Sequence, residues 1–245
     1  MIKKRIIITL TFLDGILFRT KKFIPDYRYT KNFINFWNID ELILIDISEK
    51  KFDKKFLEVI KFFSENCFVP ISVGGGIKDI ENADLLFKIG ADKILLGFES
   101  YKNPSFLENL SKKYGNQSII QAVDLKRKGV GYTIMTNSGQ KETNIDPIEF
   151  CQKVQSIGIG EILINCVDND GGLLGYDLKA IELLNDIIKC PKLVLGGCGN
   201  WEHMEECFVN YDISGVCTQN IFHFTNESIV SAKNYLMERK IFIRK

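Results

Sequence analysis

The segment Gly160-Glu161-Ile162-Leu163-Ile164-Asn165 decides the fold, because Asp40-Glu41-Leu42-Ile43-Leu44-Ile45 has the same pattern about 120 residues earlier. The glycine-rich stretches Gly74-Gly75-Gly76 and Gly196-Gly197-Cys198-Gly199 lie at a similar offset, and each is followed by a helix-period stretch and another apolar run. A period of half the chain indicates two fused copies of one half rather than a solenoid of many small units.

Short apolar runs alternate with amphipathic stretches along the whole chain. The runs are continuously apolar, which is typical of parallel strands covered on both faces. The predicted strands are 5–11, 42–46, 70–73, 93–97, 118–124, 161–167, 192–195 and 214–218, and the predicted helices lie near 31–37, 54–65, 80–89, 104–114, 147–157, 178–188, 201–208 and 226–238. We therefore predict a single (β/α)₈ TIM barrel over 1–245, with half-barrels of about 1–115 and 116–245. A doubly wound open sheet is the competing architecture.

The composition excludes several classes of function. The 245 residues are 45% hydrophobic, so the chain can bury a large core. Basic and acidic residues nearly cancel, 32 against 31, so no overall field would attract nucleic acid or an anionic membrane. The apolar run after the basic residues 3–5 is too short for a secretory signal, and no run reaches the ~20 residues of a membrane-spanning helix. Seven cysteines without a Cys-x-x-Cys pair predict reduced, buried thiols in a cytoplasmic protein with no metal and no cofactor.

Two matching strands end in different side chains. The run Ile6-Ile7-Ile8-Thr9-Leu10-Thr11 corresponds to Ile119-Ile120-Gln121-Ala122-Val123-Asp124 in the second half. Active sites of this fold lie at the carboxyl ends of the strands, where two facing carboxylates would divide acid and base work. Only Asp124 is a carboxylate here, and Thr11 takes the other position. Asp124 is the predicted general acid/base or substrate anchor.

Glycine loops at the same end of the predicted barrel indicate phosphate binding. Gly74, Gly75 and Gly76 follow a strand and open a helix, and so do Gly196 and Gly197. Glycine allows close approach of the backbone to a ligand, and the first turn of a helix offers free N–H groups and a partial positive charge. Glycine also simply turns the corner between a strand and a helix, but its presence at matching places in both halves favours binding.

Three further features carry charge. The long stretch 14–29 contains Arg19 among aromatic residues and is predicted to be a lid or binding loop, with a solvated surface loop as the alternative. The stretch 168–172 contains Asp170 and Gly171 and is more typical of a turn than of a metal site. Four charged residues lie at the starts of strands, where they would ring the bottom entrance of the barrel, although the pattern fits a structural ion-pair cluster equally well: Arg5, Glu41, Lys93 and Glu161.

Nearly the whole chain resembles the cyclase subunit of imidazole glycerol phosphate synthase. The resemblance is carried by a series of short motifs: Lys4-Arg5-Ile6-Ile7, Asp14-Gly15, Asp40-Glu41-Leu42, Asp46-Ile47, Val73-Gly74-Gly75-Gly76-Ile77, Gly90-Ala91-Asp92-Lys93, Asp124 with Lys126-Arg127, Gly160-Glu161-Ile162-Leu163, Asp168 with Asp170-Gly171, Gly175-Tyr176-Asp177, Gly196-Gly197 and Phe222-His223-Phe224. Their number and order identify the chain as a member of this family.

The resemblance implies a partner and a path for nitrogen. In that family a glutaminase subunit releases ammonia, which enters the bottom of the barrel, crosses its interior and reaches the substrate on the opposite face. The gate residues of the family match Arg5, Glu41, Lys93 and Glu161, and Asp92 matches a residue that contacts the glutaminase. The implied protein is a lyase-type cyclase subunit in a heterodimer with a class I glutaminase.

The substrate end departs from the family. Thr11 replaces the first of two catalytic aspartates, whereas Asp124 matches the second. Gly97-Phe98 replaces an Asn-Thr pair that helps to hold one phosphate, and the Phe98 ring would crowd a phosphate there. Gln219-Asn220 replaces small residues of the second phosphate site, where polar recognition is retained. The residues predicted to bind substrate or phosphate are Arg19, Gly74, Gly75, Gly76, Asp170, Gly171, Gly196, Gly197, Gln219 and Asn220.

One branch of the family resembles the sequence better, because its members lack the first aspartate and carry aromatic and proline residues in the first loop, as in Phe23, Pro25 and Tyr27. They accompany a glutaminase and a separate amidotransferase in making acetamidino sugars for surface polysaccharides. The resemblance thus implies an ammonia-accepting subunit that acts on a small phosphorylated or sugar-nucleotide substrate. The alternatives are the genuine histidine-pathway cyclase, a non-catalytic scaffold that passes ammonia to a third protein, and the related single-chain isomerase, which needs two aspartates and no gate.

Overall fold

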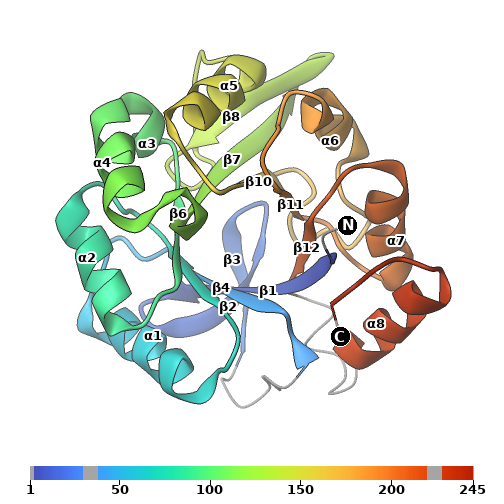
Figure 1. The fold of residues 1–245 in the computed structure, drawn as a ribbon, viewed down its shortest axis with the longest axis horizontal. Coiled ribbons are helices and arrows are strands. Elements are labelled where there is room, and N and C mark those ends of the chain that lie inside the picture. The colour runs from blue at the N-terminus through green and yellow to red at the C-terminus, as the bar shows by residue number, and fades with distance from the viewer. Residues whose placement is uncertain (1–2, 30–37, 220–227, 245) are drawn as a thin grey trace.

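The chain folds into a closed barrel of parallel strands surrounded by helices (Figure 1). The computed structural model describes residues 3–29, 38–219 and 228–244. Eight parallel strands pair in the order β10-β11-β12-β1-β4-β5-β6-β7, and β7 pairs again with β10 to close the barrel. Their bounds are β1 (Arg5–Leu13), β4 (Glu41–Asp46), β5 (Ile71–Gly74), β6 (Lys93–Leu96), β7 (Ile119–Lys128), β10 (Glu161–Cys166), β11 (Lys192–Leu195) and β12 (Gly215–Thr218). The (β/α)₈ prediction is confirmed, and the open sheet is excluded.

The helices lie outside this barrel and cover its strands. Their bounds are α1 (Lys54–Asn66), α2 (Ile80–Ile89), α3 (Glu99–Lys102), α4 (Pro104–Tyr114), α5 (Pro147–Ile157), α6 (Leu178–Asn185), α7 (Trp201–Asn210) and α8 (Ser228–Glu238), with a 3₁₀ turn η3 at Asn116–Ser118. The helix predicted near 31–37, and the start of the one predicted near 226–238, lie outside the described residues.

Helix starts follow the local chemistry of the sequence. The side chain of Asn103 accepts a hydrogen bond from the N–H of Phe106 at 3.2 Å, and Pro104 occupies the first turn of α4. Asp146 caps α5 in the same way, ahead of Pro147. A capping oxygen satisfies an N–H group that has no partner within the helix, and a first-turn proline loses no hydrogen bond.

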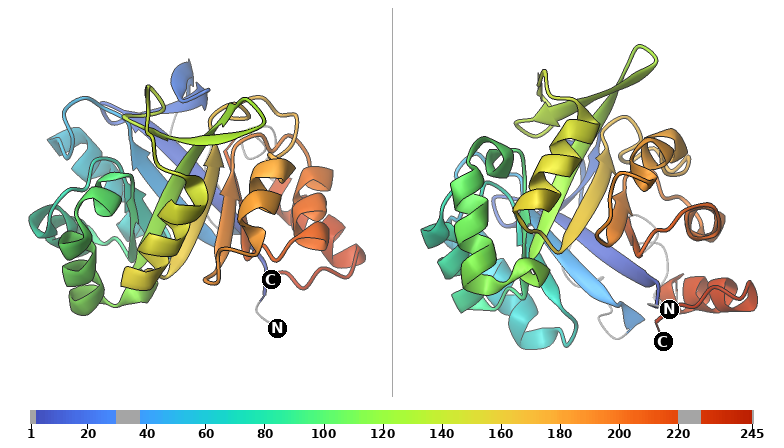
Figure 2. Two further views of the ribbon diagram at one scale, coloured as in Figure 1. Left: turned by 90° about the horizontal axis from the view of Figure 1, so that it is seen from above. Right: turned by 45° about the horizontal axis from the view of Figure 1, so that its top comes forward.

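Two antiparallel hairpins extend the barrel at the end opposite the chain termini (Figure 2). Strands β2 (Ile16–Lys21) and β3 (Ile24–Arg28) continue from β1, and β8 (Gly131–Thr136) and β9 (Lys141–Glu142) continue from β7. The prediction of a loop over 14–29 is therefore wrong in its structure. Leu17 packs into the core, and Lys22 and Phe23 adopt positive φ angles of 52° and 66° in the turn that joins the two strands.

The apolar residues form two layers. The larger layer packs the outer faces of the strands against the helices, for example through Phe12, Phe56 and Phe63. The smaller layer fills the inside of the barrel with Ile7, Ile43, Leu95, Ile120, Leu163, Leu193 and Cys217. Successive side chains of a strand point to opposite faces, so the barrel strands supply both layers.

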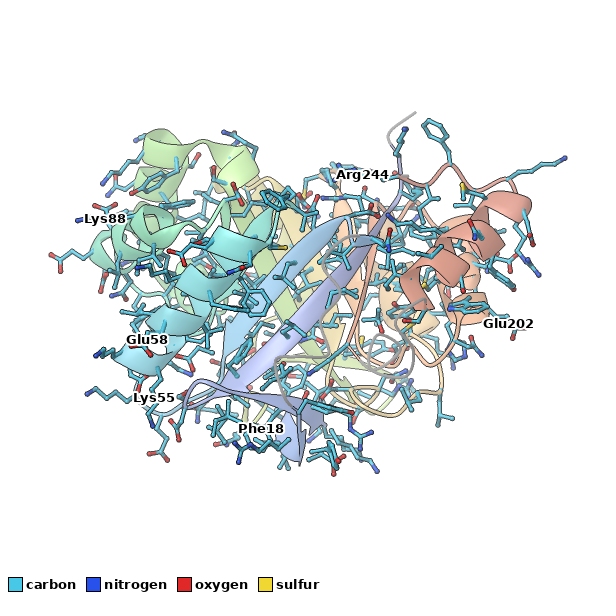
Figure 3. All side chains as sticks on the ribbon, turned by 90° about the horizontal axis from the view of Figure 1, so that it is seen from below. Phe18, Lys55, Glu58, Lys88, Glu202 and Arg244 are labelled. Atoms are coloured by element: carbon cyan, nitrogen blue, oxygen red, sulfur yellow. The ribbon has the colours of Figure 1, made fainter. Side chains whose placement is uncertain are left out.

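Both described ends of the chain lie at the end of the barrel away from the hairpins, here called the lower end; it is at the bottom in Figure 2 and at the top, near the label of Arg244, in Figure 3. Lys4 pairs with Ile243, and the ammonium of Lys233 in α8 contacts the buried carboxylate of Asp40 at 2.7 Å. None of the seven cysteines, all of which lie in the described part, takes part in a disulfide. Within the described residues, no helix combines the length and the apolar character that crossing a membrane requires.

Candidate functional site

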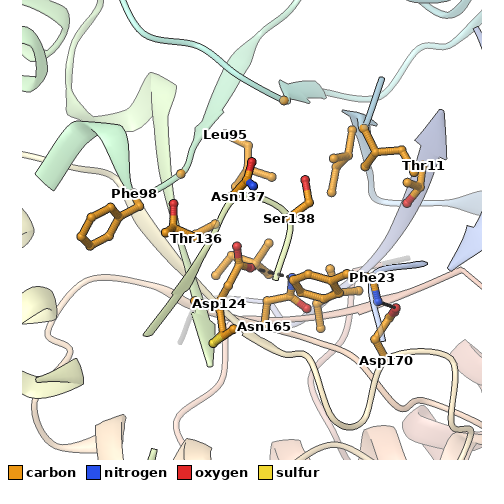
Figure 4. Close-up of a pocket in the computed structure, with 18 of the residues that line it drawn as sticks. Thr11, Phe23, Leu95, Phe98, Asp124, Thr136, Asn137, Ser138, Asn165 and Asp170 are labelled. Atoms are coloured by element: carbon orange, nitrogen blue, oxygen red, sulfur yellow. Dashed lines mark hydrogen bonds between the residues drawn. The ribbon is translucent and has the colours of Figure 1, made fainter. Parts of the chain in front are cut away.

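A cavity of about 800 Å³ opens at the upper end of the barrel, between the two hairpins (Figure 4). Thr11 and Asp124 both line it. They come from β1 and β7, which are separated by three strands in either direction around the barrel and therefore face each other across it. The structure thus brings the two predicted positions together, with a carboxylate on one side and a hydroxyl on the other.

Asp124 has a specific partner. Its Oδ1 accepts a hydrogen bond from the side-chain Nδ2 of Asn165 on the neighbouring strand β10, at 2.9 Å. Burial raises the pKa of Asp124 to about 6, the hydrogen bond from Asn165 opposes this shift, and the charge of Asp170 adds to it. A carboxylate with a pKa near neutrality can both accept and release a proton at physiological pH.

The two glycine loops border the same cavity. Gly75 and Gly76 line it with φ angles of 115° and 80°, and Gly196 and Gly197 line it with φ angles of 97° and 105°. A Cβ at Gly197 would lie 2.0 Å from a backbone oxygen, so this position accepts only glycine. Gly74 belongs to β5 and is not among the lining residues, which corrects its predicted place at the site.

Other predicted substrate residues serve the hairpin β2–β3. Asp170 lines the cavity, but its Oδ2 accepts the backbone N–H of Phe23 at 2.9 Å. The amide nitrogen of Gln219 donates to the backbone oxygen of Phe18 at 2.6 Å. Arg19 does not line the cavity and forms an ion pair with Asp26 on β3, so it is not free to face a ligand as predicted.

The remaining residues predicted at the upper end are Gly171, Asn220 and Phe98. Gly171 lines the cavity, as predicted, whereas Asn220 lies outside the described residues. The Phe98 ring stacks on Tyr101 and Phe150, with ring centroids 5.7 and 6.0 Å away, and points away from Asp124 in Figure 4. Phe98 lines the cavity, but its ring packs against α3 and α5, and the crowding of a phosphate by this ring stays a prediction.

At the lower end, four side chains form a closed ring of alternating charge. Arg5 contacts Glu41 at 2.7 Å and Glu161 at 2.9 Å, and Lys93 contacts the same two carboxylates at 3.1 and 2.6 Å. We call these residues, Arg5, Glu41, Lys93 and Glu161, the floor ring. Burial acts against the charge of Glu161, but Arg5 and Lys93 outweigh it and hold the pKa of this carboxyl below its ordinary value.

A single layer of apolar side chains separates the floor ring from the cavity. On β10, Glu161 belongs to the ring, Leu163 to the inner apolar layer and to the cavity wall, and Asn165 to the cavity wall. Strand β6 repeats the order with Lys93 in the ring and Leu95 in both the layer and the wall. The interior therefore runs from charged to apolar to polar along the barrel axis.

Beneath the ring, a shallow hollow contains Asp92. The side chain of Asp92 is exposed, and its Oδ2 accepts the N–H of Ile71 at 2.8 Å. The predicted partner-contact residue therefore lies next to Lys93 on the outer surface of the floor. No group of three or more acidic, histidine or cysteine side chains within the described ranges is arranged to hold a metal ion.

Sequence reasoning missed Asn165 and the turn at Asn137 and Ser138, which line the cavity, whereas Phe23 lines it from the stretch 14–29 that was predicted to be a lid or binding loop. The signal for Asn165 was present, because it lies four residues after Glu161 and a strand returns to the same face every second residue. The hairpin residues carried no such signal, since only the folded hairpins bring them to the mouth of the barrel.

The chain is thus a (β/α)₈ barrel with a charged ring at its amino end and an acid-bearing cavity at its carboxyl end, where proteins of this fold class have their active sites. A family model described as histidine biosynthesis protein matches residues 12–228. The imidazole glycerol phosphate synthase subunit HisF of Chlorobium phaeovibrioides (strain DSM 265 / 1930) is 35% identical over 250 residues, and the match spans 100% of both chains. HisF of Prosthecochloris aestuarii is 35% identical over 251 residues and that of Chlorobaculum tepidum 34% over 250, again over 100% of both chains. The chain belongs to the histidine biosynthesis protein family, and these relatives are synthase subunits rather than members of the acetamidino-sugar branch.

Proposed function

We propose that this protein is the ammonia-accepting subunit of a glutamine amidotransferase of the imidazole glycerol phosphate synthase type. A class I glutaminase would dock on the lower face near Asp92 and release ammonia beneath the floor ring. The ammonia would cross the barrel to a small phosphorylated or sugar-nucleotide acceptor in the upper cavity. The full-length similarity to HisF subunits supports the family-level part of this proposal.

The observation that carries the proposal is the position of the floor ring on the barrel axis. Arg5, Glu41, Lys93 and Glu161 close the lower entrance through ion pairs, while one apolar layer separates them from the cavity that contains Asp124. A barrel that had only to fold would be more simply closed by packed apolar side chains, because burying ion pairs carries a desolvation cost. A charged ring can instead open by exchanging partners when another subunit contacts it.

The chemistry at the upper end would rest on one carboxylate. Asp124, with its pKa of about 6, would take a proton from the attacking nitrogen and return it to a leaving oxygen. The hydroxyl of Thr11 cannot act as a second general base at neutral pH, because an alcohol does not ionise there. This favours a nitrogen transfer in which one group handles the proton, and it supports an altered acceptor such as an amidino-sugar precursor. The separate amidotransferase of that pathway would then be a third partner.

The histidine-pathway cyclase is the second candidate, and the 35% identity to HisF over the whole chain favours it. The two functions predict different results with the bisphosphorylated substrate of imidazole glycerol phosphate synthase and free ammonium. Our proposal predicts turnover roughly 10³-fold or more below that of a HisF subunit, because one of two cooperating acids is absent. Turnover within a few fold of HisF would establish the histidine-pathway cyclase instead.

The glutaminase part is tested separately. Glutamine hydrolysis by the partner glutaminase is measured alone, with the wild-type chain, with Glu161→Ala and with Asp92→Ala. We expect stimulation by the wild type, altered stimulation with Glu161→Ala and weaker binding with Asp92→Ala. Lys112→Ala, on the outer surface of α4, is the matched control and should behave as the wild type. If the wild-type chain neither binds nor stimulates the glutaminase, the proposed function is wrong. If Asp124→Asn still stimulates the glutaminase and the complex forms product at the wild-type rate, the protein is a non-catalytic scaffold.

A further inference from the structure

In the side-chain amide of Asn165, the nitrogen has a hydrogen-bond partner, whereas the oxygen has none among the described residues. Its Nδ2 donates to Asp124 Oδ1 at 2.9 Å, which fixes the orientation of the amide because a carboxylate can only accept. The other polar atom, Oδ1, is buried and has no hydrogen-bond partner within the described chain, and Asn165 is only 8% exposed. A buried carbonyl oxygen without a partner is unfavourable, and Asn165 lines the cavity, so a ligand in the cavity can donate to this oxygen.

The position of this free oxygen indicates where that ligand comes from. Asn165 lies on β10 directly above Leu163 and Glu161, so it is the first polar side chain on this strand beyond the floor ring and the apolar layer. The carboxyl group of Asp124 lies beside it, as the dashed line in Figure 4 shows. A small ligand at this level would meet two acceptors, Asn165 Oδ1 and the unshared oxygen of Asp124.

We propose that Asn165 and Asp124 form a binding site for neutral ammonia at the end of the passage through the barrel. Ammonia has three N–H donors and one lone pair. Two donors would bind the Asn165 carbonyl and the Asp124 carboxylate, and the lone pair would remain free to face the upper cavity. This deepens the proposed function and rests on it, because it places the nucleophile at the carboxylate that handles its proton.

The reaction step balances without a further reactant. The nitrogen lone pair forms a bond to an electrophilic carbon of the acceptor, and the nitrogen becomes positively charged. Asp124 takes one of its protons and then gives that proton to the oxygen that leaves the same carbon. Asn165 remains hydrogen bonded throughout and acts as a positioning residue for both the nitrogen and the carboxylate.

The test needs no acceptor substrate. The full chain, labelled with ¹³C at the aspartate carboxyl carbons, is titrated with ammonium chloride between pH 7.5 and 9, and Asp124 is assigned by comparison with Asp124→Asn. In this range Asp124 is ionised, while the neutral fraction of ammonia rises with pH. We expect a saturable shift of the Asp124 signal that follows the concentration of neutral ammonia, whereas sodium chloride at the same ionic strength has no effect.

Two variants make the result specific. Asn165→Leu removes both hydrogen bonds at similar size and should raise the half-saturating ammonia concentration at least about tenfold. Asn165→Thr returns an acceptor oxygen and should recover most of the affinity. The site is disproved if the Asp124 signal does not saturate, if it follows total ammonium instead of ammonia, or if Asn165→Leu binds as tightly as the wild type. If the Asp124 signal saturates but the chain does not stimulate the glutaminase, the ammonia site is supported and the proposed function is refuted. If the chain stimulates the glutaminase but the Asp124 signal does not saturate, the ammonia site is refuted and the proposed function is supported.

Discussion

Removing Lys93 would test whether the floor ring is a balanced set of charges. The Nζ atom of Lys93 contacts Glu41 at 3.1 Å and Glu161 at 2.6 Å, and these carboxylate side chains are only 4% and 9% exposed. In Lys93→Met, Glu161 depends on Arg5 alone, and Glu41 keeps Arg5 and the more distant Arg244 at 3.7 Å, so the ring itself is left with one negative charge in excess. Breaking a buried ion pair by removing one partner costs about 3–5 kcal/mol, and we expect the lower end, about 3 kcal/mol, because Arg5 remains.

The assay is thermal and denaturant unfolding of Lys93→Met beside the wild type. For a domain of this size, a loss of about 3 kcal/mol lowers the melting temperature by about 6–12 °C. Lys112→Met is the control, because Lys112 forms an exposed ion pair with Glu108 and its loss should change stability by less than about 1 kcal/mol. The double variant Lys93→Met/Glu41→Gln restores neutrality and should lose less than the sum of its single variants.

The pH dependence gives an independent check. In the wild type Arg5 and Lys93 hold the pKa of Glu161 below its ordinary value against the effect of burial. Without Lys93 this pKa rises, so protonation on acidification removes the excess charge and narrows the difference in unfolding free energy between Lys93→Met and the wild type. The reasoning is refuted if Lys93→Met and Lys112→Met lose equally little stability, or if the difference from the wild type does not change with pH.

Two more predictions concern the upper end. Burial raises the pKa of Asp124 in the folded protein from 3.8 to about 6, so the ionised carboxylate destabilises the fold above pH 6, and this effect is absent below the pKa of the unfolded chain. In denaturant unfolding, Asp124→Asn should therefore be more stable than the wild type by about 1–3 kcal/mol at pH 8 and equally stable near pH 3.5. An equal gain in stability at both pH values would contradict this prediction. Gly197→Ala should lose more than about 2 kcal/mol, because its Cβ would lie 2.0 Å from the Gly175 oxygen at a φ of 105°, whereas Gly97→Ala, with nothing within 4 Å, should be near neutral; equal melting temperatures for the two variants would disprove the close contact.

The sequence was sufficient to predict the barrel because its strands and helices carry strong local signals. The continuous apolar runs correspond to strands within a few residues, as for the run 42–46, which is β4 (Glu41–Asp46). The capped starts at Asn103 and Asp146 are also present as predicted. The hairpins were missed because β2 and β8 fold back on the ends of the barrel strands β1 and β7, and the hairpins depend on turns such as those at Lys22 and Gly129 rather than on a long apolar pattern.

The residues that reach each end of the barrel could be predicted from the sequence, but the contacts of their side chains could not. Strand ends fix which residues reach the two ends of a barrel, so Asp124 and the floor ring were found from position and family resemblance. The position of a residue along a strand or loop does not reveal which side chain it will contact. Arg19 was expected at the ligand but pairs with Asp26, and the Phe98 ring stacks on Tyr101. The role of the buried amide of Asn165 became apparent only once its hydrogen bond to Asp124 was seen.

The most direct measurement of the central claim follows nitrogen from glutamine to Asp124. The complex with the glutaminase is supplied with glutamine while glutamate dehydrogenase removes ammonia from the bulk solution, and the ¹³C signal of Asp124 is recorded. We predict that the ammonia-bound signal persists in the wild type and disappears in Leu163→Trp, which fills the apolar layer above the floor ring, provided that this variant remains folded and docked. A wild-type signal that disappears together with the bulk ammonia would contradict a passage through the barrel.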